Sequence, residues 1–243
     1  MVLFDFFYEL SFSTIDGESM RLFTVYFFLL FLLAALPSGA QETIGLAEIS
    51  NYLHDETGGG AQNWQIAQDK KGFLYFANNS GLLVFTNKEW KLFPLPNRTI
   101  VRALALSPEG RIYTGGQDAI GYFSPDPNGQ LIYHDLTELL PQEEKKFGDV
   151  WNVILYQGDY YFRTSGRIIR YTPGAKHRMT LYKSPTGFRW SFMGLSNNTL
   201  YAQNGKESLV YFTGNEWRAV GNVLLGNTLI TGILSYNKDT SLV

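Results

Sequence analysis

Short, largely apolar runs alternate with polar turns through the region that begins at residue 64. The first four runs occupy 64–68, 73–77, 82–85 and 90–93. The segments between them are rich in Asp, Asn, Lys and Gly, and such turns favour hairpins. Runs of this length bounded by such turns predict four antiparallel strands. The second run is almost continuously apolar, so we expect a strand that is buried on both faces.

A glycine or asparagine followed three residues later by tyrosine recurs along the chain. The four tyrosines are Tyr75, Tyr113, Tyr161 and Tyr201, spaced about 40 residues apart except where a charged insertion at 138–148 widens the interval. A second aromatic residue follows each tyrosine in nearly constant register, at Phe85, Phe123, Tyr171 and Phe212. Two units add a tryptophan after this landmark, Trp90 and Trp217, for which we expect a structural role on outer strands. Landmarks that recur in step indicate a structural repeat.

Four strands repeated at this interval predict an all-β fold, a β-propeller with four-stranded blades. A β-sandwich would lack the long period, and a helical solenoid would show apolar residues at helical spacing. The expected blades span roughly 62–97, 98–137, 149–185 and 188–225, with an incomplete fifth at 228–243. About four and a half blades do not close a ring, and propellers close to remove open sheet edges. We therefore expect the chain to be an N-terminal piece of a longer protein.

The N-terminal region has the three parts of a secretory signal. Met20 and Arg21 precede the apolar stretch Leu22–Leu36, and small residues follow at Ser38 and Ala40. This pattern predicts a signal peptide over residues 20–40 and a periplasmic location, with an uncleaved anchor as the alternative. Acids precede Met20, so we expect residues 1–19 to be a spurious extension. Residues 41–61 then form a leader, and 62–243 the partial propeller.

Composition excludes several classes of site. The sequence has no cysteine, which removes disulfides, thiolate metal ligands and cysteine nucleophiles. The formal net charge is −2 with no basic stripe, so nucleic-acid binding is not expected. His54, His134 and His177 do not pair at metal-ligand spacing, and no phosphate-binding glycine loop is present. We expect no metal, no cofactor and no catalytic residue in this segment.

The first unit carries a more specific pattern. Its motif Ile66-x-x-Asp69-x-x-Gly72-x-Leu74-Tyr75-Phe76-Ala77-Asn78-x-x-Gly81-Leu82-x-x-Phe85 resembles the blade motif of the two-component regulator propeller family. Residues 62–69 are similar to the opening blade of members that also carry a triple-tyrosine module. The match is clearest over residues 62–137. Family blades commonly have tryptophan where this chain has its repeated tyrosines, which keeps an aromatic plug between blades.

The resemblance implies a periplasmic sensor of a Gram-negative bacterium rather than an enzyme. Such receptors continue through further blades, a β-sandwich connector, a membrane helix and a cytoplasmic output, either a kinase, a cyclase or a helix-turn-helix module. The ligand that the resemblance implies is an oligosaccharide. It also implies self-association in the full receptor, and contact with the membrane only through a downstream helix.

The candidate ligand-binding residues lie where the first strands begin, because first strands line a propeller's axis. They are Trp64, Arg102, Trp151, Arg189 and Trp190. Aromatic faces stack on sugar rings, and guanidinium groups bind carboxylates or hydroxyls. The alternative is that these tryptophans only fill gaps between blades.

Three functions remain open from these residues. The favoured one is a ligand-sensing receptor module, and the alternative is a non-signalling secreted or surface glycan-binding propeller. The third is a propeller lyase or hydrolase, which requires acids or histidines to converge at the axis. The loop acids Asp118, Asp126 and Asp149 are the candidates for such a pair.

Overall fold

The repeated glycine or asparagine is required by the turn between the first and second strand of each unit. In the computed structural model, which describes residues 17–34, 45, 49–205, 209–221 and 228–243, this residue always has a positive φ. The angle is 87° at Gly72, 83° at Gly110, 86° at Gly158 and 54° at Asn198. Glycine adopts this conformation without strain, and asparagine tolerates it better than most residues.

Each unit folds into one antiparallel sheet whose strands pair in chain order. Blade 1 contains β1 (Asn63–Gln68), β2 (Leu74–Asn78), β3 (Gly81–Phe85) and β4 (Trp90–Phe93). Blade 2 contains β5 (Val101–Leu106), β6 (Ile112–Gly116), β7 (Ala119–Pro125) and β8 (Leu131–Asp135). Blade 3 contains β9 (Asn152–Tyr156), β10 (Asp159–Arg163), β11 (Arg167–Tyr171) and β12 (Met179–Lys183). Blade 4 contains β13 (Trp190–Ser196), β14 (Thr199–Asn204), β15 (Leu209–Phe212) and β16 (Trp217–Ala219).

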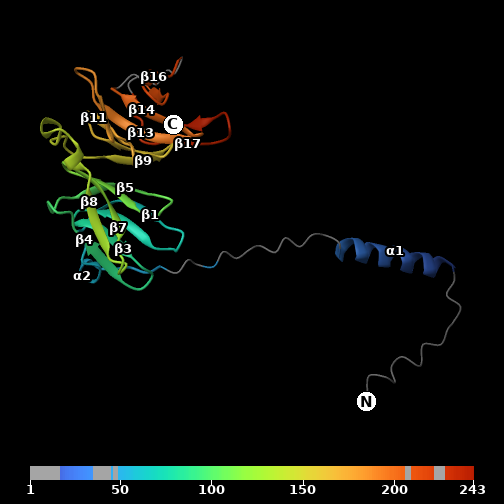
Figure 1. Cartoon of the computed structure of the whole chain (residues 1–243). Coiled ribbons are helices and arrows are strands. Elements are labelled where there is room, and N and C mark those ends of the chain that lie inside the picture. Colours follow the sequence, from blue (N-terminus) through green and yellow to red (C-terminus); the bar gives the residue numbers. More distant parts are fainter. Residues whose placement is uncertain (1–16, 35–44, 46–48, 206–208, 222–227) are drawn as a thin grey trace. The chain divides into compact units, whose positions relative to one another are not determined.

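The blades follow one another around an axis lined by their first strands. β5 packs against β1 on one side and β9 on the other, and β9 in turn packs against β13 (Figure 1). A two-stranded sheet of β17 (Leu234–Ser235) and β18 (Ser241–Leu242) follows, with β17 against β13. The predicted fold class, an incomplete β-propeller, is confirmed.

The expected fifth blade at 228–243 begins without regular strand structure. Regular strand begins only at Leu234, although Ile230 and Ile233 are already buried. Both side chains pack against Phe192 and Leu209 of blade 4. Burial of this segment therefore comes from side-chain packing rather than from sheet pairing.

The repeated tyrosines fill the spaces between blades. The Tyr113 ring of β6 stacks on Tyr160 of β10, with ring centroids 3.4 Å apart. Tyr161 of β10 meets Phe212 of β15 edge-on at 5.4 Å. The second strands of blades 1 to 3 are buried along nearly their whole length, whereas β14 of blade 4 is only partly buried. The expected burial of β2 is observed, and it packs against blade 2.

The two outer tryptophans pack on the aromatic landmarks of their own blades. Trp90 pairs across the sheet with Phe85, with ring centroids 4.7 Å apart. Trp217 pairs with Phe212 in the same way at 5.0 Å. Tyr52 of the leader covers Trp90 at 5.2 Å. It precedes the one-turn helix α2 (His54–Thr57).

The charged insertion joins blades 2 and 3. It contains two short 3-10 turns, η2 (Thr137–Leu139) and η3 (Gln142–Glu144). Leu140 and Phe147 are buried in the hydrophobic cluster shared by the two blades. The Glu144 carboxylate pairs with Arg167 of β11 and lies 2.6 Å from the Lys183 ammonium of β12. The insertion is therefore part of the packing between blades.

The Asp118 carboxylate binds the end of this insertion, so the stability that this contact contributes depends on pH. Its Oδ1 accepts the backbone N–H groups of Phe147 and Gly148, each at 2.7 Å, and Lys146 lies 3.4 Å from Oδ2. Burial raises the pKa of the Asp118 carboxyl, but the two backbone hydrogen bonds and the Lys146 ammonium outweigh it, so the pKa lies below its usual 3.8. A depressed pKa in the folded state contributes stability above the unfolded pKa, and that stability is lost as the pH falls through the folded value.

Replacing Asp118 with asparagine is expected to lower the free energy of unfolding by about 1 kcal/mol at neutral pH, because a neutral amide accepts these bonds more weakly at a partly exposed site. The difference between wild type and variant should shrink as the pH falls below about 4. Urea unfolding of the full chain at a series of pH values measures it. A difference that stays constant down to about pH 2 would contradict the assignment.

In its described residues, the N-terminal unit (Met1–Ser50) forms the helix α1 (Gly17–Ala34). Its large apolar side chains from Met20 to Phe31 are exposed. No helix in the part of the chain that the structure describes is long and apolar enough to cross a membrane. Residues 35–40 of the expected signal peptide and residues 1–16 of the expected spurious extension lie outside the described residues.

Candidate functional site

A β-bulge recurs at the start of the inner strands. The pairing register shifts between Asn63 and Gln65 in β1 and between Val101 and Ala103 in β5. The extra residues in these two bulges are Trp64 and Arg102. A bulge opposes two residues to one and redirects a side chain, and bulges often lie beside functional sites.

Trp151 occupies the equivalent position in blade 3. Asn152 pairs with Arg163 there, as Gln65 pairs with Ala77 in blade 1, and both partners follow the repeated tyrosine by two residues. Trp151 directly precedes this pair, and its N–H donates to the Arg163 carbonyl at 2.8 Å. Trp64, Arg102 and Trp151 therefore lie at the same level of the axis in three neighbouring blades.

The three side chains form one cluster. The Arg102 guanidinium carbon lies 4.3 Å from the centre of the Trp64 ring and 4.7 Å from that of Trp151. The two indoles are 6.1 Å apart and meet at 77°. Both guanidinium distances are within the range of cation–π attraction. Trp64 and Trp151 each keep more than a third of their surface exposed, at 39% and 38%.

Polar neighbours fix the orientation of this cluster. Arg102 Nε lies 2.9 Å from Asp149 Oδ1, within ion-pair distance, although the angle is not that of a hydrogen bond. The Trp64 indole N–H donates to Asn79 Oδ1 at 2.7 Å. Asp149 directly follows the insertion between blades 2 and 3, so the connection between these blades also positions the Arg102 side chain.

Trp190 and Arg189 do not join the cluster. The register shift in β13 falls between Trp190 and Phe192, so Ser191 occupies the bulge position of blade 4. Trp190 is one residue earlier, and a shift of one residue along a strand turns a side chain to the opposite face. It is 3% exposed, and its ring packs on Trp217. For Trp190 the gap-filling interpretation holds, and Arg189 is an exposed residue on the connector before it.

Sequence reasoning missed Arg163 of β10. Its side chain is 8% exposed; Nε donates to Asn152 Oδ1 at 2.6 Å, and Nη1 donates to the Trp190 carbonyl at 2.8 Å. Burial lowers the pKa of the Arg163 guanidinium to about 10. A signal in the sequence could have identified it: Arg163 is a charged residue at the end of the strand Asp159–Arg163, whose apolar interior predicts burial.

Of the histidines and loop acids considered as candidates, only Asp149 reaches the cluster, through Arg102. His134 lies on the outer strand β8, where its ring stacks on Tyr122 at 4.6 Å. His54 lies on α2 and His177 on the turn before β12. Asp126 accepts backbone N–H groups of its own turn, as Asp118 does in the insertion. Within the described residues, no group of three or more His, Asp or Glu could hold a metal ion.

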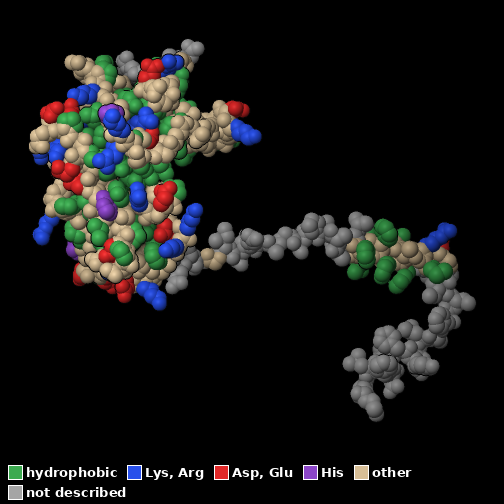
Figure 2. Space-filling model, viewed as in Figure 1, with side chains coloured by type: hydrophobic (Ala, Val, Ile, Leu, Met, Phe, Trp, Pro, Cys, Tyr) green, Lys and Arg blue, Asp and Glu red, His purple; other side chains and the backbone are tan. Residues whose placement is uncertain are grey.

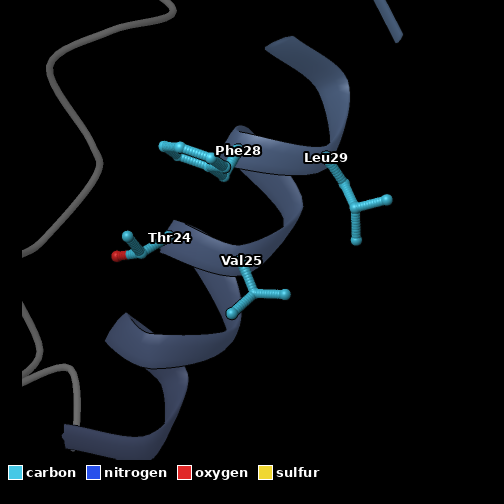
Figure 3. Close-up of a pocket in the computed structure, with 4 residues that line it drawn as sticks. All are labelled: Thr24, Val25, Phe28 and Leu29. Carbon is cyan, nitrogen blue, oxygen red and sulfur yellow. The ribbon is translucent and has the colours of Figure 1, made fainter. Parts of the chain in front are cut away.

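Two surface hollows lie away from the cluster. One is on α1, lined by Thr24, Val25, Phe28 and Leu29, which occupy adjacent turns of the helix (Figure 3). Its single polar group, the Thr24 hydroxyl, already donates to the Met20 carbonyl. The other, of about 250 Å³, lies on blade 2, and four of its charges form two pairs, Lys145 with Glu138 and Lys146 with Asp118. Its remaining charge, Asp135, accepts the Thr137 N–H. The buried Tyr133 hydroxyl, which also lines this second hollow, has no hydrogen-bond partner among the described residues.

Charges are interspersed over the blades. On the face shown in Figure 2, Lys and Arg alternate with Asp and Glu and form no single basic stripe. This distribution matches the near-neutral formal charge and offers no extended surface for a polyanion on that face.

No family model matches the sequence, and no curated protein matches it. Solved structures match the fold. Virginiamycin B lyase from Staphylococcus aureus aligns with a TM-score of 0.56 at 18% identity, over 78% of this chain and 64% of the lyase. The extracellular domain of the hybrid two-component system BT4673 from B. thetaiotaomicron aligns with a TM-score of 0.54 at 16% identity, over 69% of this chain and 24% of that domain.

A second extracellular domain of this kind, from BT3049 of B. thetaiotaomicron, aligns with a TM-score of 0.50 at 13% identity over 65% of this chain. The expected resemblance to propeller sensor regions is thus confirmed at the level of fold. This chain spans less than two thirds of the lyase and about a quarter of the sensor domains.

Proposed function

We propose that the chain is the extracytoplasmic ligand-sensing propeller of a signal-transduction receptor, of two-component or transcription-regulator type. The ligand is an oligosaccharide held by Trp64, Arg102 and Trp151. The observation that carries this proposal is the cluster itself, in which adjacent blades place two part-exposed indoles around one guanidinium at the axis. The structural likeness to extracellular domains of two-component systems supports the receptor class.

The cluster has the chemistry that sugar binding needs. Indole faces stack on the apolar faces of sugar rings, while a few polar groups orient the hydroxyls. Asn79 supplies an oxygen atom beside the Trp64 indole, and Asp149 supplies one beside the Arg102 guanidinium. Since their partners Trp64 and Arg102 hold both side chains in place, little ordering remains to be done on binding.

Export is part of the same proposal. The signal-like segment at residues 20–40 directs the blades to the periplasm, where polysaccharide fragments are available. In the full receptor, ligand occupancy changes how the propellers associate. Membrane contact is made only by a helix encoded further downstream.

The alternative is a secreted or surface glycan-binding propeller that does not signal. It would use the same cluster, so binding data do not separate the two. Reading the gene beyond the codon for Val243 does: a spanning helix followed by a kinase or helix-turn-helix module supports the receptor, and closure of the propeller alone supports the alternative.

A lyase is less well supported than either, despite the fold of virginiamycin B lyase. That protein is described in a catalytically inactive H270A form, which points to a histidine in its chemistry. In this chain the three histidines, all within the described ranges, lie on α2, on an outer strand and on an outer turn. The inner strands β1, β5, β9 and β13 contain no histidine.

Replacing Trp64 or Trp151 with alanine is expected to weaken oligosaccharide binding by about tenfold or more, because each change removes an indole face from the cluster. Isothermal titration of the full chain against a panel of neutral and acidic trisaccharides measures the effect. The matched control is Trp217→Phe, an aromatic change on an outer strand, which should bind as wild type does. Unchanged binding in both alanine variants, with the chain folded, would remove the cluster from the proposed site.

A further inference from the structure

Arg163 carries a buried charge that no carboxylate balances. Its side chain is more than nine-tenths buried, between the inner strands of blades 3 and 4. Among the residues that the structure describes, no Asp or Glu lies within ion-pair distance of it; its two acceptors, an Asn152 amide oxygen and the Trp190 carbonyl, are both neutral. An isolated buried charge is costly. A neutral amide donor could serve the same kind of acceptor without that cost.

Part of the guanidinium remains available. Nε and Nη1 are occupied, whereas Nη2 has no partner in the described part of the chain and is not fully buried. The group stays protonated at neutral pH, since burial lowers its pKa only to about 10. A directed N–H group on a fixed cation is well suited to bind an oxyanion.

Its position is continuous with the proposed site. The Arg163 carbonyl accepts the N–H of Trp151, and its guanidinium binds the side chain of the next residue, Asn152. The start of blade 4, at Trp190, closes the other side. Arg163 therefore lies on β10 next to Trp151, with its guanidinium on the side toward blade 4.

Arg102, the other arginine of the proposed site, differs in that it already has an acidic neighbour. Arg102 lies between two indoles and is within ion-pair distance of Asp149, so its charge is already balanced. A ligand anion would have to displace Asp149 from Arg102, whereas at Arg163 it would meet no competitor in the described residues.

We infer that Arg163 binds an acidic group of the ligand, so that the ligand class is an acidic oligosaccharide such as a uronate or sialic-acid-containing fragment. This inference rests on the proposed function and deepens it. The sugar rings stack on Trp64 and Trp151, while a carboxylate reaches Arg163 Nη2.

The test compares saccharides that differ only in charge. Trigalacturonate, trimannuronate and sialyllactose are each titrated into the full chain beside their methyl esters. The acidic form of at least one pair should bind about 10- to 100-fold more tightly than its ester, the worth of a hydrogen bond to a charged group. That preference should decrease as the salt concentration rises.

Variants then assign the preference to one side chain. Arg163→Gln should bring acid and ester to equal affinity while leaving the affinity for the ester near that of wild type, and Arg163→Lys should keep part of the preference. Arg102→Gln is the matched control, and it should retain the preference for the acid even if both forms bind more weakly. Thermal unfolding of each variant shows that the blades are intact, and the salt dependence of wild type tests the charge without any variant.

The outcomes separate the two proposals. Equal binding of every acid and its ester, or a loss in Arg163→Gln that is the same for both, overturns the acidic class and leaves the saccharide site standing. No binding of any saccharide overturns the proposed function, and the inference with it. A preference lost in Arg102→Gln rather than in Arg163→Gln moves the anion to Arg102 and refutes the assignment.

Discussion

Replacing Tyr161 with alanine is expected to lower the free energy of unfolding by about 3–5 kcal/mol, the cost of deleting a fully buried aromatic ring. Tyr161 is 1% exposed and contacts Phe212 of the next blade and Tyr156 of its own. The ring fills the space between blades 3 and 4, and the surrounding strands are held by their own hydrogen bonds. The cavity would therefore collapse only in part, so the loss should be near the upper end of the range.

Urea unfolding of the full chain, followed by circular dichroism, measures this loss. Tyr161→Phe is the matched control, since it keeps the ring and removes only the hydroxyl, and it should cost less than about 1 kcal/mol. If alanine and phenylalanine reduce stability equally, the hydroxyl rather than the ring would be the important group. The repeated tyrosine would then not act as a plug between blades.

Replacing Arg170 with methionine is expected to cost about 3 kcal/mol, the low end of the range for breaking a buried ion pair, because Arg170 itself is partly exposed. The Asp159 carboxylate is 9% exposed, and its Oδ2 lies 2.6 Å from Arg170 Nε and 2.5 Å from Nη2. Nη1 also donates to the Gly214 carbonyl of blade 4 at 2.9 Å. Methionine preserves most of the side-chain volume but leaves Asp159 buried without a partner.

A double-mutant cycle with Asp159→Asn separates the ion pair from packing. The double variant should lose less stability than the sum of the two single variants, because removing Asp159 also removes the charge that Arg170→Met leaves unpaired. Strictly additive losses in urea unfolding would show that the two residues act independently. Arg170 would then contribute mainly through its bond to Gly214.

The blade architecture was predictable because it depends on local and repeated features. A turn that needs positive φ selects glycine or asparagine at Gly72, Gly110 and Asn198, wherever the blade lies in the ring. The aromatic side chain three residues later must fill the gap to the next blade, so it recurs with the same period. Such signals can be detected in a single sequence because the same structural constraint acts in every blade.

The site was predictable only in part, because it depends on register. Trp64 and Arg102 were candidates from their place at the start of a strand, and the structure brings both to the Trp151 ring. Trp190 had the same apparent place, yet the bulge of blade 4 falls at Ser191. A shift of one residue decides whether a side chain faces the axis or the core, and the hydrophobic pattern does not show at which residue the bulge falls.

Period, turn chemistry and the apolar second strands are properties of the chain taken unit by unit, and they were sufficient to predict a propeller with four-stranded blades. Arg102 of blade 2 pairs with Asp149, which directly follows the insertion. Arg163 of blade 3 donates to the Trp190 carbonyl of blade 4. Those contacts form only when neighbouring sheets are packed at their final angles. Whether a given arginine is balanced by an acid or left with a free N–H is therefore a property of the assembled blades, because the charges that face it come from other parts of the chain.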